Sequence, residues 1–422
     1  MMQFLRLFLA VFFLVAGLSS LCFAQGWQPV LESTALLPEF MVAVDKGSQK
    51  LHMLVHQSPL HAEVSFSCAT GQASGDKVSE GDLKTPEGVY FTTGKRTGLT
   101  DFELYGTMAF PLDFPNPVDR IKGKTGYGIW IHGRGKKLLP RDTKGCVALV
   151  NEDISVLDSR VKPGTPVVIG ETLSWSGASG QQPAESEELE KLVRKWAADW
   201  ENRDNAFFDA YSPELFTKSD DSSFKNFRKR KKRIFSSTDW IDIELYNIKA
   251  LPGPDYWVTW FDQYYRSGRL SSSTSKRLYW QKIDGKWKIV GREYGPAISS
   301  LKGRYLDSKR PEVKAFLERW RSEWLAADLA EYISFYDSMA SQGRRRGVSA
   351  IGESKKRIWE NRKPATLEFG SFELAEHPLG LEVGFLQNYS DVSGYSDKGF
   401  KKLVIRPQGD SWLIVDEQWR KL

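Results

Sequence analysis

Cysteine is scarce in this chain of 422 residues, which contains only Cys22, Cys68 and Cys146. Three cysteines do not make the disulfide framework of a small secreted domain, and they cannot supply the four thiolates of a structural zinc site. Histidine is nearly as rare, with five residues, and His52, His56 and His61 are spread over one predicted hairpin. We therefore expect neither a metal nor an organic cofactor.

Long hydrophobic runs are also missing, apart from one near the N-terminus. The run from Leu7 to Leu18 follows Arg6 and is too short to span a bilayer comfortably. It predicts a secretory signal peptide over residues 1–24, cleaved before Gln25. Lipidation at Cys22, or a retained anchor, is the alternative. We expect secretion across the inner membrane into the periplasm or cell envelope, with no transmembrane helix after cleavage.

The excess of basic over acidic residues is small, because 59 basic and 53 acidic residues leave a net charge of +6. This balance favours an anionic polymer or surface as a partner without specifying one. The basic run at residues 228–233 is typical of a solvated helix face. Nucleic acid is an implausible partner for an exported protein.

A length of 422 residues indicates several domains. Residues 38–170 contain short β-rich runs, and a turn at Asp45–Ser48 predicts a hairpin between the first two. Residues 151–157 predict a short helix with Asn151 as its N-cap. Residues 171–186, rich in Ser, Gly, Gln and Pro, are expected to form a linker.

The rest of the chain is an internal duplication, with copies at residues 187–300 and 308–422. The recurring pairs are Trp196 with Trp320, Trp200 with Trp324, Lys231 with Lys355, Tyr265 with Tyr389, Glu293 with Glu417 and, after one inserted residue, Trp287 with Trp412. Each copy begins with an amphipathic helix and ends in strands, an α+β layout. This order resembles the nuclear-transport-factor-two-like cone fold.

The residues that carry chemistry are His132-Gly133 and, further along the chain, Gly145-Cys146. A free cysteine has a pKa of about 8.5, so a thiol nucleophile needs a base at neutral pH. His132 can accept the Cys146 proton and return it to a leaving amine, while the Gly133 carbonyl can fix the imidazole tautomer. Gly145 permits a tight turn that directs backbone N–H groups toward an oxyanion. Cys68 has no such neighbours and is expected in the core.

These residues resemble the motif of the L,D-transpeptidase family, which has His-Gly at a strand end followed by Ser/Thr-x-Gly-Cys. Here the second part reads Thr143-Lys144-Gly145-Cys146-Val147, and Thr85-Pro86-Glu87-Gly88 matches the family's Thr-Pro-x-Gly turn. The resemblance implies a mainly β catalytic domain at residues 38–170. It also implies attack on the third residue of a tetrapeptide stem of peptidoglycan, loss of the terminal D-residue and a thioester on Cys146.

The sequence departs from the family pattern next to the nucleophile. Lys144 stands where many members have His, and Ala148 stands where many have Arg. Arg134, Arg141 and Lys144 are therefore the candidates for binding substrate. The altered motif, together with the appended cone-fold copies, is similar to that of cell-shape L,D-carboxypeptidases. In those enzymes water resolves the thioester.

Three functions follow as hypotheses. The first is a transpeptidase-family acyl transfer to an amine on peptidoglycan stem peptides. The second is a carboxypeptidase that shares the same residues. The third is a scaffold that binds wall glycan or a partner and has an idle catalytic domain. The two C-terminal copies are expected either to hold the enzyme on the wall or to cover an apolar flank. The sequence specifies neither the acceptor, the ligand of the copies nor the oligomeric state.

Overall fold

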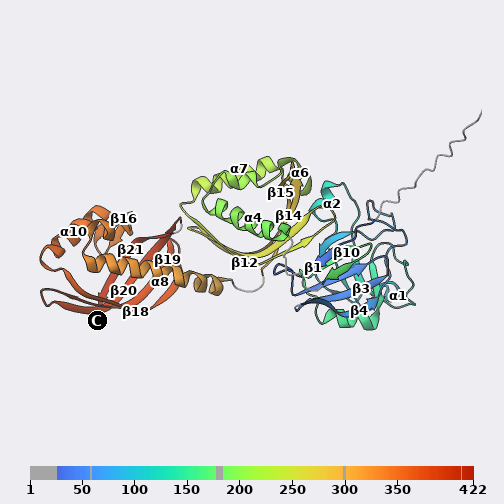
Figure 1. Cartoon of the computed structure of the whole chain (residues 1–422), viewed down its shortest axis with the longest axis horizontal. Helices are drawn as coiled ribbons and strands as arrows, with labels where there is room; N and C mark the ends of the chain where they lie inside the picture. The colour runs from blue at the N-terminus through green and yellow to red at the C-terminus, as the bar shows by residue number, and fades with distance from the viewer. Residues whose placement is uncertain (1–25, 58, 177–183, 298–300, 410) are drawn as a thin grey trace, which may run out of the picture.

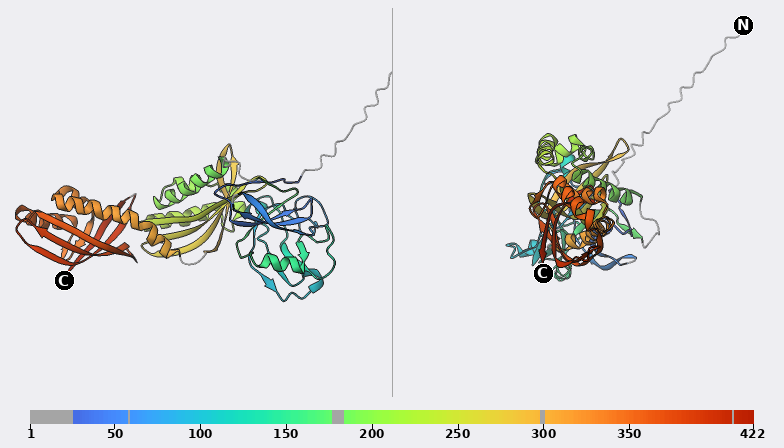
Figure 2. Two further views of the ribbon diagram at one scale, coloured as in Figure 1. Left: turned by 60° about the horizontal axis from the view of Figure 1, so that its bottom comes forward. Right: turned by 90° about the vertical axis from the view of Figure 1, so that its left-hand side faces the viewer.

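The computed structural model describes residues 26–57, 59–176, 184–297, 301–409 and 411–422. The predicted signal peptide and residues 177–183 of the predicted linker lie outside these ranges. The described chain forms an N-terminal β domain and two cone domains in a row, as Figures 1 and 2 show. This arrangement confirms the fold class expected from the sequence. Among the described residues, no helix has the length and apolarity needed to cross a bilayer.

The N-terminal domain is built on a five-stranded sheet with the order β4-β3-β2-β10-β5. Its strands are β2 (Phe40–Asp45), β3 (Lys50–His56), β4 (Leu60–Ser67), β5 (Gly88–Phe91) and β10 (Pro166–Gly170). Strands β2 and β3 form the predicted antiparallel hairpin. Val42 and Val44 belong to one hydrophobic cluster, while Met41 and Ala43 belong to another. Burial on both faces explains the continuous apolar run of β2.

A second sheet of four strands, in the order β6-β7-β8-β9, shares the first of these clusters. Its strands are β6 (Arg96–Thr97), β7 (Met108–Pro111), β8 (Trp130–Arg134) and β9 (Val147–Val150). Helices α1 (Phe102–Tyr105) and α3 (Asn151–Asp158) pack against it, while α2 (Pro117–Ile121) packs against α6 (Pro213–Ser219) and β15 (Lys286–Pro296) of the first cone domain. Cys68 is 2% exposed and lies in the shared core, as expected.

The predicted N-cap role of Asn151 is wrong. Asn151 is the first residue of α3, and Val150 takes the cap position without a side-chain hydrogen bond. The Asn151 amide instead joins the segment before β7 to the end of β8, because Oδ1 accepts from the Thr107 N–H at 2.9 Å and Nδ2 donates to the Arg134 carbonyl at 3.1 Å.

Strand β11 (Ser174–Ser176) lies inside the predicted linker and pairs in parallel with β1 (Val30–Glu32). The first cone domain then runs from α4 to β15. Its elements are α4 (Ala184–Glu201), α5 (Ala206–Asp209), α6 (Pro213–Ser219), α7 (Phe224–Ser237), β12 (Ile241–Pro252), β13 (Trp257–Ser267), β14 (Leu270–Ile283) and β15 (Lys286–Pro296). The helices enclose an aromatic core against the antiparallel sheet β12-β13-β14-β15.

The second cone domain repeats this plan. Its helices are α8 (Lys302–Ala326), α9 (Leu329–Ser334) and α10 (Val348–Asn361). Its strands are β16 (Tyr336–Gln342), β17 (Arg345–Arg346), β18 (Pro364–His377), β19 (Gly380–Asp391), β20 (Ser396–Gln408) and β21 (Ser411–Lys421). The opening tryptophan pair recurs with nearly the same geometry, since the ring centroids of Trp196 and Trp200 lie 5.3 Å apart and those of Trp320 and Trp324 lie 5.2 Å apart.

Strand pairing corrects one predicted correspondence between the copies. Phe261 pairs with Lys276 in the first cone, and Phe385 pairs with Lys401 in the second. The sequence offset between equivalent residues of the two copies therefore increases by one within the hairpin that connects these strands. The next pairs are Leu278 with Arg292 in the first cone and Leu403 with Glu417 in the second. Glu417 therefore corresponds to Arg292, and its predicted correspondence to Glu293 is wrong.

The first cone domain packs directly on the N-terminal β domain. One hydrophobic cluster contains Val89 and Phe91 of β5 together with Tyr256 and Val258 of the cone sheet. The Tyr256 hydroxyl is buried there. It accepts from the Val89 N–H at 2.9 Å and from Asn116 Nδ2 at 3.0 Å. The copy thus covers an apolar flank, which was one of the two roles expected from the sequence.

Tyr256→Phe should weaken this interface, because it removes the acceptor of the buried Val89 N–H and leaves Asn116 Nδ2 with only the Val89 carbonyl. We expect the free energy of unfolding to fall by about 1–3 kcal/mol in urea denaturation. Tyr395→Phe is the matched control, because its hydroxyl is exposed and donates to Asp397 at 3.0 Å. An equal loss in both variants would show that the Tyr256 hydrogen bonds do not stabilise the interface.

Candidate active site

Cys146 directly precedes β9, at the end of a tightly held turn. Gly145 has φ +130°, and a Cβ there would lie 2.8 Å from the Lys84 carbonyl oxygen, so only glycine fits. Thr143 closes the turn, because its hydroxyl donates to the Cys146 carbonyl at 2.7 Å and accepts from the Gly145 N–H at 3.1 Å. This turn therefore brings the two motifs noted in the sequence, around Lys84-Thr85 and Gly145-Cys146, into contact.

His132 lies on β8, the parallel neighbour of β9. Ile131 pairs with Val147 and His132 pairs with Ala148. Cys146 therefore precedes Val147 of the first pair by one residue, and His132 follows Ile131 of the same pair by one residue. Side chains alternate along a strand, so His132 and Cys146 leave the sheet on the same face.

The imidazole is held in one orientation by its own backbone. His132 Nδ1 lies 2.7 Å from the Gly133 carbonyl oxygen, the hydrogen bond that the sequence led us to expect. Because a carbonyl can only accept, Nδ1 carries the proton and Nε2 keeps its lone pair. Gly133 itself packs against Asn151, whose Oδ1 would lie 2.5 Å from an added Cβ.

Burial keeps both candidate groups neutral at rest. It lowers the pKa of His132 to about 4, although the hydrogen bond to Gly133 acts in the opposite direction. It also raises the pKa of the Cys146 thiol to about 11. The thiol lies 3.5 Å from the Gly128 carbonyl oxygen. A neutral imidazole on the same strand face as a neutral thiol can act as a base when a substrate arrives, without a preformed ion pair.

The three candidate substrate-binding residues occupy different positions. Arg134 is buried, and its guanidinium donates to the Asp142 carbonyl at 2.9 Å and to its carboxylate at 2.6 Å. Arg141 lies 3.5 Å from a Glu171 carboxylate oxygen. Lys144 is exposed beside the nucleophile. Arg134 thus holds the loop that leads to Cys146, and Lys144 is open to solvent.

Two aromatic residues at this site were not found by the sequence reasoning. The Tyr105 ring lies 5.2 Å from the His132 ring and 5.3 Å from the Trp130 ring, measured between centroids. Arg96 lies 5.1 Å from the Trp130 centroid. The position of Trp130, two residues before His132, places it on the same strand face and could have identified it. No comparable signal marks Tyr105.

The chain resembles known proteins over both its catalytic and its cone domains. The sequence profile of the L,D-transpeptidase catalytic domain (YkuD) matches residues 39–169, and that of the Cds6 C-terminal NTF2-like domain matches residues 188–293 and 312–418. Residues 39–169 are therefore an L,D-transpeptidase catalytic domain. The two cone domains are NTF2-like domains of the Cds6 C-terminal type. No match is found among curated proteins.

Two solved structures share this architecture. Bd1075 of Bdellovibrio bacteriovorus is 26% identical, with a TM-score of 0.52, and the match covers 64% of this chain and 97% of Bd1075. Pgp2 of Campylobacter jejuni, described as a helical cell shape determining protein, is 29% identical, with a TM-score of 0.50. That match covers 60% of this chain and 91% of Pgp2. The catalytic domain is thus that of a peptidoglycan enzyme.

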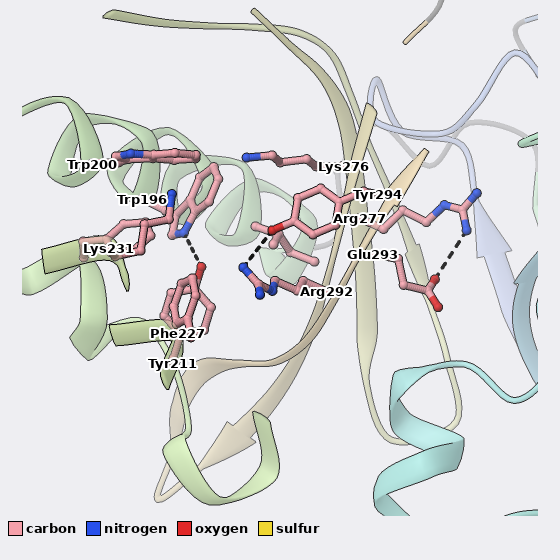
Figure 3. Close-up of a pocket in the computed structure, with 12 residues that line it drawn as sticks. Trp196, Trp200, Tyr211, Phe227, Lys231, Lys276, Arg277, Arg292, Glu293 and Tyr294 are labelled. Carbon is pink, nitrogen blue, oxygen red and sulfur yellow. Dashed lines mark hydrogen bonds and ion pairs between the residues drawn. The ribbon is translucent and has the colours of Figure 1, made fainter. Parts of the chain in front are cut away.

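A second candidate site lies in the first NTF2-like domain, between α4, α7 and the sheet. Two neighbouring pockets share Trp200, Lys231, Lys276 and Tyr294 in their linings. One has a volume of about 420 Å³, and the other, drawn in Figure 3, has a volume of about 10 Å³. The two ammonium groups lie 3.2 Å (Lys231) and 4.1 Å (Lys276) from the Trp200 ring centroid. Among the described residues, neither ammonium has a hydrogen bond or an ion pair. Burial and the neighbouring Arg292 lower the pKa of both lysines.

The pH dependence of catalysis should follow from the pKa of His132. A general base must be unprotonated, and a pKa of about 4 keeps His132 in that form down to about pH 4. We expect kcat/KM on a soluble tetrapeptide to fall only near that pH, not near the value of about 6.5 of an ordinary histidine. The rate of Cys146 alkylation by iodoacetamide should rise with pH toward about 11. An acid limb near pH 6.5 would contradict the buried, neutral imidazole.

Proposed function

We propose that this protein is an exported cysteine acyl-transferase that acts on peptidoglycan stem peptides, with Cys146 as nucleophile and His132 as base. The observation that carries the proposal is the placement of both side chains on one face of the β8–β9 pair. The Gly133 carbonyl holds Nδ1 and leaves Nε2 available as the proton acceptor. The predicted export and the peptidoglycan substrate together favour the periplasm or cell envelope as its location.

The first half-reaction follows from these groups. The Cys146 sulfur attacks the carbonyl carbon of the third stem residue as its proton passes to His132 Nε2. The Gly145 N–H is already bonded to Thr143, so the Cys146 N–H is the candidate donor from this turn for the oxyanion. The C–N bond to the terminal D-residue then breaks, the amine leaves with the proton from His132, and a thioester remains on Cys146.

The acceptor distinguishes the two enzymatic hypotheses. An amine from a neighbouring stem gives a cross-link, and water gives a tripeptide. The similarity to Pgp2, which covers 60% of this chain, favours water, as in the cell-shape L,D-carboxypeptidases whose motif this sequence resembles. By the same similarity, we propose a role in cell shape. Lys144, the exposed member of the three candidates, is the proposed contact for a substrate carboxylate.

Digestion of purified sacculi, followed by mass analysis, tests the activity and its acceptor. Tripeptide stems indicate a carboxypeptidase, and cross-links between third residues indicate a transpeptidase. Cys146→Ser should abolish both products and His132→Ala should slow their formation about a hundredfold or more, with the fold retained. Cys68→Ser, at the core cysteine, is the control for thiol loss. If the wild-type protein binds sacculi and releases no product, the scaffold hypothesis replaces the enzymatic one.

The pocket of the first NTF2-like domain supports the expected anchoring role. Lys276 is 6% exposed, and Figure 3 shows its ammonium pointing into the pocket toward Trp200. Burial lowers the pKa of Lys276, and an anionic ligand would stabilise its protonated form, so the pocket is suited to such a ligand. Carboxylates are present on stem peptides, and we propose that this pocket binds the wall polymer while Cys146 acts elsewhere on it.

Lys276→Met should weaken sacculus binding about tenfold or more and leave turnover of a soluble tetrapeptide unchanged. The variant should be as stable as the wild type or more so, because an unpaired buried charge is replaced by a side chain of similar volume. Binding by the wild type should strengthen as the pH falls, since the protonated lysines bind the anion. Lys232→Ala, at an exposed position on α7, is the matched control. Equal sacculus binding by Lys276→Met and wild type would end the anchoring proposal.

A further inference from the structure

The second NTF2-like domain has the same pair of lysines at its centre. Lys355 corresponds to Lys231 and lies 3.7 Å from the Trp324 ring centroid, while Lys401 corresponds to Lys276 and lies 5.1 Å from it. Lys401 is 3% exposed and Lys355 is 9% exposed. The cationic centre of the cone has thus been kept in both copies.

What differs is the residue on the last strand that faces these lysines. In the first domain this residue is Arg292, whose Nε lies 2.9 Å from Asp220 and whose Nη1 lies 2.7 Å from the Tyr294 hydroxyl. In the second domain the same register position holds Glu417. A third cation in one copy is therefore replaced by an anion in the other.

Glu417 is held as a bound carboxylate ligand would be. It is 3% exposed and forms an ion pair with Lys401. Its Oε2 accepts from the Tyr336 hydroxyl at 2.5 Å and from Gln342 Nε2 at 2.7 Å. Although burial opposes ionisation, Lys401 and Lys355 hold the pKa of Glu417 at about 2. The carboxylate is thus charged and bonded through both oxygens at neutral pH.

We propose that Glu417 is a built-in ligand: it fills the anion site of the second NTF2-like domain with the chain's own carboxylate and closes that site to external anions. The first domain, which has no carboxylate on Lys231 or Lys276 among the described residues, is then the copy that takes a carboxylate from outside. The assignment of the first domain as the copy that binds an external carboxylate rests on the anchoring role proposed above, and it names the chemical group that is recognised. The assignment of Glu417 as a built-in ligand concerns the second NTF2-like domain alone.

Two physical points support this assignment. A buried ammonium is stabilised by a carboxylate that reaches it, and in the second domain such a carboxylate is supplied at no cost in association entropy. The two copies present the same lysine positions and the same glutamine, Gln263 or Gln387, on the adjacent strand. Of these groups Lys401 forms the ion pair with Glu417, so a carboxylate is the ligand chemistry that we expect at the equivalent Lys276.

The test is to remove the built-in carboxylate from the full-length protein and offer a free one. Glu417→Ala leaves space beside Lys401, so acetate should bind there and raise the melting temperature of the variant saturably, while sodium chloride at equal ionic strength should not. The double variant Glu417→Ala/Lys401→Met should lose this acetate effect. Glu382→Gln, which removes a half-buried partner of Lys402 on the same sheet, is the control and should show no acetate effect beyond that of the wild type.

The outcomes separate this inference from the anchoring proposal. In the wild type, acetate should occupy only the first pocket, and Lys276→Met should abolish that binding. An acetate site gained in Glu417→Ala supports the inference whatever happens at the first pocket. If Glu417→Ala binds no more acetate than the wild type does, the built-in ligand is refuted, even where Lys276-dependent binding persists. Should the second domain of Glu417→Ala unfold, refolding on addition of acetate supports the inference, and failure to refold while Glu417→Gln remains folded overturns it.

Discussion

The geometry of the active site depends on one backbone contact, the approach of Gly145 to the Lys84 carbonyl. A Cβ at this position would lie 2.8 Å from that oxygen. The contact fixes the turn that ends at Cys146, and the parallel pairing of β9 with β8 then fixes where His132 emerges. Catalytic geometry is thus set by rigid backbone elements, which hold functional groups more accurately than mobile loops do.

Burial serves the two candidate sites in opposite ways. At the active site it keeps His132 and Cys146 neutral, so no charge is buried until a substrate is present. In the first NTF2-like domain it confines two lysines whose charges lack a partner among the described residues. Burial disfavours the protonated form of these lysines, and the anion site proposed for this pocket would restore it.

Local sequence predicted the parts of this protein that local chemistry determines. The β2–β3 hairpin follows from its turn residues, and the duplication follows from the recurring tryptophans and lysines. The Gly133 carbonyl was identified as the partner of His132 because it is adjacent in the chain. Contacts between distant segments left no such signal, which is why Tyr105 and the interface at Tyr256 emerged only from the fold. Two errors have the same origin: the partners of Asn151 lie in distant segments of the chain, and the shift between the copies falls within a hairpin.

The docked interface also determines how recognition relates to cleavage. Arg277 illustrates this: it lies on the pocket strand β14, yet its guanidinium lies 2.6 Å from Asp113 of the catalytic domain and 3.7 Å from the Phe91 ring centroid. Figure 3 shows Arg277 and Glu293 directed away from the pocket lysines, toward the catalytic domain. The sheet that forms the wall of the pocket is therefore the same sheet that packs on the enzyme. For a polymer held at Lys276, the distance between Lys276 and Cys146 would be set by this packed interface. The bond that is cleaved along the polymer would therefore depend on the fold and not on a flexible tether.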